Sequence, residues 1–158
     1  MKEEINKLNE LADFFKRINK RVLLYTLVNK AKAEYDKCNF QDSKQNLEEA
    51  YKVDKNDPTV LRGLGNLELF NKNFDKAIDF YNKALEYSEK KEVEYTLLGM
   101  AYYLQDKLDD ALHYFNSAID VNDSYTSAYE GRNQTMLENH LKIIDLQEGL
   151  ENYFRPQG

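Results

Sequence analysis

The sequence predicts an all-α protein, built as an α-solenoid of stacked antiparallel helix hairpins. Residues that favour helices dominate the 158 positions, whereas only six glycines and two prolines interrupt them. A pattern of small and bulky side chains also returns every 34 residues, a period typical of helical repeats. No segment shows the alternation of apolar and polar residues that a half-buried strand requires, so we expect no sheet.

The repeat divides the chain into three blocks that align without a gap, over residues 24–57, 58–91 and 92–125. Each block is predicted to form two helices, which in the third block run near 92–105 and 108–121. A small residue falls where the two helices of a block cross, and a bulky residue of the second helix fills the space beside the next helix. The small residues are Ala31, Gly65 and Gly99, and the bulky ones are Leu47, Tyr81 and Phe115.

Amphipathic segments flank the blocks and are expected to cap the stack, because a repeat contacts only its neighbours. Residues 1–20 are predicted to form an N-terminal amphipathic helix with a break near Asn19, although no Gly or Pro separates it from the first block. Residues 126–153 are predicted to form a long C-terminal capping helix. The closing residues, 154–158, are expected to fray.

The repeat pattern resembles that of the tetratricopeptide repeat family. The third block carries it most completely, whereas the second has Glu68 where an aromatic residue is usual and the first departs from it at Lys30 and Glu34. The matching residues of the third block are Tyr95, Leu98, Gly99, Tyr102, Ala111, Phe115 and Ala118. The resemblance implies a right-handed superhelix whose concave face is formed mainly by the first helix of each pair.

Composition and charge exclude several classes of function. The chain has 28 acidic and 22 basic residues, and this acidic balance argues against nucleic acid as the main partner. The chain has no long apolar run, so we expect no membrane insertion, and its start lacks the apolar stretch of a signal peptide, which predicts a cytoplasmic protein. One cysteine and two histidines without clustered ligands predict no metal site and no cofactor.

The concave face implied by the resemblance is the predicted binding site for a peptide or protein segment. By helical register it is an apolar and aromatic trough with a few polar groups, which suits a peptide. The candidate residues are Tyr25, Val28, Lys32, Tyr35, Arg62, Asn66, Leu69, Phe70, Thr96, Met100, Tyr103, Leu104 and Gln134. The alternative is that the C-terminal helix or a second copy of the chain covers this trough.

Arg62 and Asn66 lie one helical turn apart and face the same way. Members of the family that grip a C-terminal carboxylate use a basic residue and an Asn at these places, and then an Asn and two basic residues in later repeats. The later positions here hold Leu97, Ser127 and Gly131, so we expect no such clamp. Arg62 is expected either to pair one acidic group of a ligand or to be solvated, with its stem on Phe70.

These features predict a non-enzymatic adaptor or scaffold that binds a protein or peptide, since no catalytic set of side chains or phosphate-binding loop occurs. Two alternatives stay open. Three repeats with flanking helices in a chain of this size also resemble the type III secretion chaperones that hold translocator proteins. The exposed ends of a repeat stack also fit a self-assembling structural module, that is, a homo-oligomer formed through the terminal helices.

Overall fold

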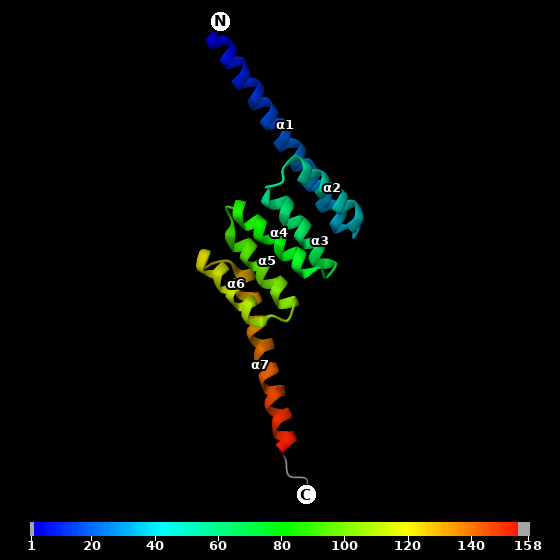
Figure 1. Ribbon diagram of the computed structural model, residues 1–158, viewed down its shortest axis with the longest axis vertical. Coiled ribbons are helices and arrows are strands. Elements are labelled where there is room, and N and C mark those ends of the chain that lie inside the picture. Colours follow the sequence, from blue (N-terminus) through cyan, green and yellow to red (C-terminus); the bar gives the residue numbers. More distant parts are fainter. Residues whose placement is uncertain (1, 155–158) are drawn as a thin grey trace.

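The computed structural model describes residues 2–154, with side chains described for residues 5–148, and every regular element in that part is an α-helix. The helices are α1 (Lys2–Asp36), α2 (Phe40–Val53), α3 (Pro58–Phe70), α4 (Phe74–Tyr87), α5 (Lys91–Leu104), α6 (Leu108–Val121) and α7 (Thr126–Phe154). Each helix packs against the next along the chain, most extensively within the pairs α1–α2, α3–α4 and α5–α6. Three hairpins therefore stack in a row, and α1 and α7 extend from opposite ends of the stack (Figure 1). The predicted α-solenoid is confirmed.

The predicted fit of small against bulky side chains holds the hairpins together. A Cβ atom built on Gly65 would lie 2.5 Å from Cε1 of Tyr81, and one built on Gly99 would lie 2.9 Å from Cδ1 of Phe115. Both aromatic rings are buried, so any larger residue at these glycines would force them to move. In the first hairpin, Ala31 takes the place of the glycine and lies in one buried cluster with Leu47.

The turn inside each hairpin is built in the same way. The turn residues Cys38, Lys72 and Asp106 have left-handed backbones, with φ of 63°, 60° and 65°. The next amide then donates to a carbonyl five residues earlier, which satisfies an acceptor at the end of the first helix. These bonds join Asn39 to Glu34 at 2.9 Å, Asn73 to Glu68 at 2.8 Å and Lys107 to Tyr102 at 3.0 Å.

Glu34 and Glu68, which depart from the family pattern in the sequence, close the first two turns. The side-chain amide of Asn39 donates to Glu34, and that of Asn73 donates to Glu68, each at 2.8 Å. Hydrogen bonds from Lys37 and Asn39 hold the pKa of the Glu34 carboxyl below its usual value. In the third turn, the ammonium group of Lys107 instead lies over the ring of Tyr102, 5.7 Å from its centre.

The break predicted near Asn19 is absent, because α1 runs without interruption from Lys2 to Asp36. No Gly or Pro occurs around Asn19 to interrupt the i to i−4 hydrogen bonds, so the helix continues. The expected N-terminal helix over 1–20 and the first helix of the block 24–57 are therefore one helix. Its C-terminal part packs against α2, and its N-terminal part projects beyond the stack (Figure 1).

The first turns of α7 cover the last hairpin, and the rest of the helix projects away from it (Figure 1). Ala128 and Thr135 are fully buried, whereas Met136 and Leu137 are exposed. The predicted frayed segment begins at the last residue of α7, and residues 155–158 lie outside the described part of the chain. Among the described residues, no helix combines the length and the apolar character needed to cross a membrane.

Candidate peptide-binding groove

An open cavity of about 470 Å³ lies along the first helices of the three hairpins. Its apolar part is formed by Val28, Ala31, Leu47, Val93 and Leu97, and its polar part includes Lys32, Asp36, Thr59, Arg62 and Asn66. The described part of α7 contributes no residue to the lining, so the C-terminal helix leaves this cavity open. We call it the groove.

The groove brings together five of the residues predicted from the sequence, namely Val28, Lys32, Tyr35, Arg62 and Asn66. Thr96 does not belong to this set, because it is buried and its hydroxyl donates to the carbonyl of Glu92 at 2.8 Å. Leu69 is half-buried against the core formed by α4 and α5. Phe70 instead packs on Phe40, with ring centres 4.1 Å apart.

The remaining predicted residues lie outside the lining of the groove. Tyr25, Met100 and Leu104 are exposed, and their role in binding stays a prediction. The amide of Gln134 donates to the hydroxyl of Tyr103 at 3.4 Å, which links α7 to α5. The apolar surface predicted from the sequence is therefore only partly gathered into one cavity.

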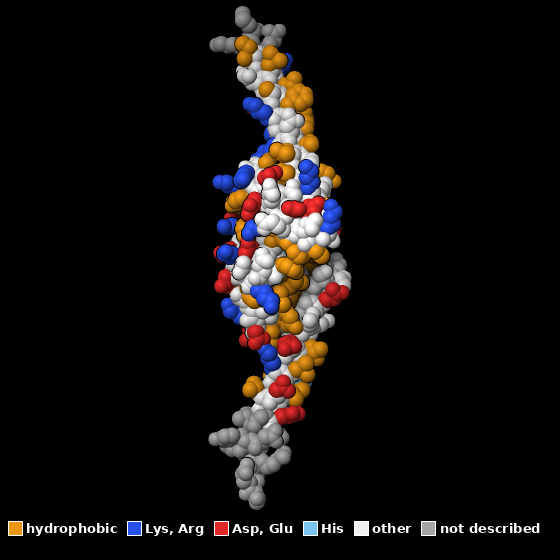
Figure 2. Space-filling model, turned by 90° about the vertical axis from the view of Figure 1, so that its right-hand side faces the viewer, with side chains coloured by type: hydrophobic (Ala, Val, Ile, Leu, Met, Phe, Trp, Pro, Cys, Tyr) orange, Lys and Arg blue, Asp and Glu red, His pale blue; other side chains and the backbone are white. Residues whose placement is uncertain are grey.

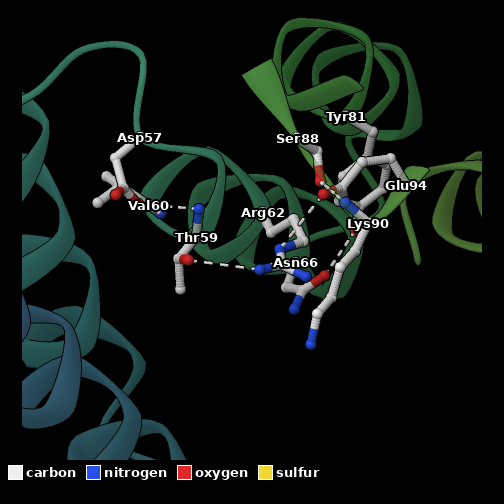
Figure 3. Close-up of polar contacts among 9 residues, drawn as sticks. All are labelled: Asp57, Thr59, Val60, Arg62, Asn66, Tyr81, Ser88, Lys90 and Glu94. Atoms are coloured by element: carbon white, nitrogen blue, oxygen red, sulfur yellow. Dashed lines mark hydrogen bonds and ion pairs between the residues drawn. The ribbon is translucent and has the colours of Figure 1, made fainter. Parts of the chain in front are cut away.

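Arg62 is held in the groove by neighbours on two helices (Figure 3). Its Nη2 atom donates to Oγ1 of Thr59 at 3.3 Å, and its Nε atom lies 3.6 Å from Oε1 of Glu94 on α5. Asp57 accepts from the amides of Thr59 and Val60 at 2.9 and 3.0 Å, which fixes the start of α3. The guanidinium group is therefore positioned before a ligand arrives, while about a quarter of its side chain stays exposed, at 26%.

Asn66 is oriented by the core. The buried hydroxyl of Tyr81 donates to Oδ1 of Asn66 at 2.8 Å, and burial raises the pKa of that hydroxyl, which keeps its proton in place (Figure 3). Because the amide oxygen accepts this bond, the NH2 group of Asn66 is left to donate to a ligand. Lys32, Arg62 and Asn66 together offer donors for the carbonyl or carboxylate oxygens of a peptide.

Glu94 is a buried acid beside the groove that the sequence analysis missed. Its side chain is fully buried, and its charged partner among the described residues is Arg62, whose Nε atom lies 3.6 Å from Oε1. Burial raises the pKa of Glu94, whereas the Ser88 hydroxyl and the Arg62 guanidinium act in the opposite direction. The signal in the sequence is its place four residues before Leu98, on the face of α5 that becomes buried.

Replacing Glu94 by glutamine is expected to remove one pH-dependent part of the stability. A carboxyl with a pKa above its ordinary value of 4.5 holds its proton more tightly in the folded state. The wild-type chain therefore loses stability, relative to Glu94→Gln, as the pH rises from 4.5 through the raised pKa. Urea denaturation of both chains across this range measures the difference, and a difference that stays constant with pH would contradict the assignment.

Stacked helix hairpins with an open groove define a class of helical repeat proteins whose members typically serve as non-enzymatic protein-interaction modules. Two family models described as tetratricopeptide repeat match this chain, one over residues 28–91 and one over residues 95–125. The chain belongs to the tetratricopeptide repeat family.

The chain is similar to short parts of two longer proteins. The chain is 33% identical to the heat shock protein STI1 of Saccharomyces cerevisiae over 90 residues, and 34% identical to anaphase-promoting complex subunit 7 of Dictyostelium discoideum over 93 residues. These matches cover 56% and 59% of this chain but only 15% of each relative. The first tetratricopeptide repeat domain of Spaghetti (RPAP3), solved with an HSP90 peptide, has a TM-score of 0.67 over 74% of this chain and 93% of that chain, at 14% identity. This last likeness shows the shared fold.

Proposed function

We propose that the chain is an interaction module that binds an extended segment of another protein in the groove, and that it acts as an adaptor. The observation that carries the proposal is the open cavity in which positioned donors lie beside an apolar wall. Main-chain carbonyls and an acidic side chain of the bound segment would accept from Lys32, Arg62 and Asn66, and its apolar side chains would contact Val93 and Leu97. Peptide binding by the similar RPAP3 domain supports this function for the fold.

We do not expect the C-terminal carboxylate of the ligand to be the main contact. Leu97 presents an apolar side chain to the groove, and a Cβ atom on Gly131 would collide with Phe115, so this position serves packing. The groove therefore keeps one Arg and Asn pair from α3, together with Lys32 from α1. An internal segment of a partner fits these groups as well as a C-terminal tail does.

Peptides selected on the wild-type chain by phage display supply the probes for a test by fluorescence polarisation. Lys32→Glu is expected to raise the Kd about ten-fold or more. The change replaces the ammonium group that donates a hydrogen bond to a ligand oxygen by a carboxylate, which repels that oxygen. Lys83→Glu makes the same change of charge on the exposed face of α4 and serves as the control. Blocking the peptide C-terminus as an amide is expected to change the Kd by less than about two-fold.

The outcome that would contradict this proposal is equal binding of the selected peptides to the wild type and to the folded variant Lys32→Glu/Arg62→Ala. Circular dichroism and thermal unfolding of each variant establish that the stack is intact. The secretion-chaperone alternative has no specific observation in its favour among the relatives described above, and stays a prediction from the layout of the sequence.

A further inference from the structure

The two terminal helices project from opposite ends of the stack, and both projecting parts expose apolar side chains (Figures 1 and 2). We call residues 5–23 of α1 the N-arm and residues 136–148 of α7 the C-arm. We propose that the N-arm of one copy of this chain pairs with the C-arm of a second copy, so that the protein associates through unlike ends. This association leaves the groove free and does not depend on peptide binding.

The N-arm carries a continuous apolar stripe. Leu8, Leu11, Phe15, Ile18 and Val22 follow each other at alternating steps of three and four residues, so they lie on one face of the helix. Between 39% and 65% of the surface of each of these residues is exposed. This spacing is the one by which two helices pack along a common seam, and an exposed stripe of this length marks an interaction surface.

The C-arm offers a shorter stripe of the same kind. Leu137, Leu141 and Ile144 follow at steps of four and three residues, and Leu137 and Leu141 are 60% and 48% exposed. Ile143 and Leu146 expose further apolar surface outside this stripe, on the other side of the helix, at 47% and 68% exposed. At about 1.5 Å per residue the C-arm spans about 20 Å and the N-arm about 28 Å, so the C-arm stripe fits within the length of the N-arm.

The charges that border the N-arm stripe are basic. A rotation of about 100° per residue places Lys7 and Arg21 nearest the stripe, along one edge. Lys16 and Glu10 lie further round the helix on opposite sides, and Asp13 lies on the back. Lys16 also lies 3.5 Å from Asp13, in a pair whose side chains are both largely exposed. Such an exposed pair contributes little to stability, so it is readily exchanged for a contact with a partner.

The charges that border the C-arm stripe are acidic. The same rotation places Glu138 and Asp145 along one edge of the stripe, and places Glu148 in line with it, one turn after Ile144. The described basic residue of this arm, Lys142, is paired with Asp106 at the junction with the stack. On the face shown in Figure 2, basic and apolar side chains gather over the N-arm, and acidic and apolar side chains gather over the C-arm.

This difference in charge selects the pairing of unlike arms. Two N-arms would bring basic edges together and two C-arms would bring acidic edges together, whereas an N-arm beside a C-arm pairs basic with acidic edges along one apolar seam. Each arm therefore pairs with a second copy of this chain, because that copy carries the complementary arm at its other end.

Complementation between two variants tests the proposal. Leu11→Glu/Phe15→Glu breaks the N-arm stripe, and Leu137→Glu/Leu141→Glu breaks the C-arm stripe. At about 100 μM, sedimentation velocity is expected to show the wild type above its monomer mass, each variant alone as a monomer, and their equimolar mixture as a dimer. Only the pairing of unlike arms gives this result, because each variant supplies the arm that the other lacks. Tyr87→Glu, an exposed site on α4, is expected to associate like the wild type.

A monomeric wild type, a monomeric mixture, or self-association by either variant alone would overturn the proposal. A second set of variants leaves the apolar stripes intact in case the first set fails to fold. Lys7→Glu/Arg21→Glu and Glu138→Lys/Asp145→Lys are each expected to weaken association about ten-fold or more, and a chain that carries all four changes is expected to recover it. Failure of the four changes to restore association would contradict the assigned charge pairing.

Discussion

Replacing Phe115 by alanine is expected to lower the free energy of unfolding by about 3–5 kcal/mol. The ring is 2% exposed and lies between Gly99 of α5 and Gly131 of α7. Its loss removes apolar burial and leaves a cavity where three helices meet, which the rigid hairpins close only in part. Urea denaturation followed by circular dichroism measures the loss, and hydrogen exchange is expected to show weaker protection in the first turns of α7.

A matched control for Phe115→Ala is Phe14→Ala in the N-arm, where the ring is 50% exposed. This change is expected to lower the free energy of unfolding by less than about 1 kcal/mol, because the ring contributes little to the packed stack. Equal losses for the two variants would show that Phe115 does not join the last hairpin to α7.

Replacing Gly131 by leucine is expected to lower the free energy of unfolding by about 1–3 kcal/mol, although leucine favours a helix more than glycine does. A Cβ atom at this position would lie 2.3 Å from Cε1 and 2.5 Å from Cζ of Phe115. The ring has little room to move away, because a Cβ on Gly99 would meet it from another helix at 2.9 Å. Thermal and urea denaturation measure the effect.

The double variant Gly131→Leu/Phe115→Ala separates crowding from a general loss of helix packing. Without the ring, the leucine side chain has space to fill, so the double variant is expected to be more stable than the sum of the two single losses predicts, by about 1 kcal/mol or more. Strict additivity would indicate that Gly131 and Phe115 do not compete for the same space.

Much of the stack could be predicted from the sequence, because the hairpins depend on pairs of side chains at fixed spacing. Gly65 with Tyr81 and Gly99 with Phe115 are visible as a small and a bulky residue repeated 34 positions apart, and the structure brings each pair into contact. The turns are harder to see in the sequence, since the carboxylate and amide pair of Glu68 and Asn73 replaces an aromatic contact by a hydrogen bond.

The groove could be predicted only in part. Helical register gives the direction in which a side chain leaves its helix, and this was sufficient for Val28, Lys32 and Arg62. Register does not show which positions a neighbouring helix covers, so Thr96 was expected at the surface and is buried. The continuity of α1 past Asn19 follows from local helix propensity, which outweighs the boundary that the repeat alone suggests.

The claim that the groove binds the ligand is tested most directly by nuclear magnetic resonance. The 15N-labelled chain is titrated with a peptide that was selected on the wild-type chain by phage display. The account predicts that the largest shifts fall on the amides of Val28, Lys32, Arg62, Asn66 and Leu97, with small changes along α4 and α6. Shifts confined to the N-arm, the C-arm or the second helices of the hairpins, with the groove amides unchanged, would contradict it.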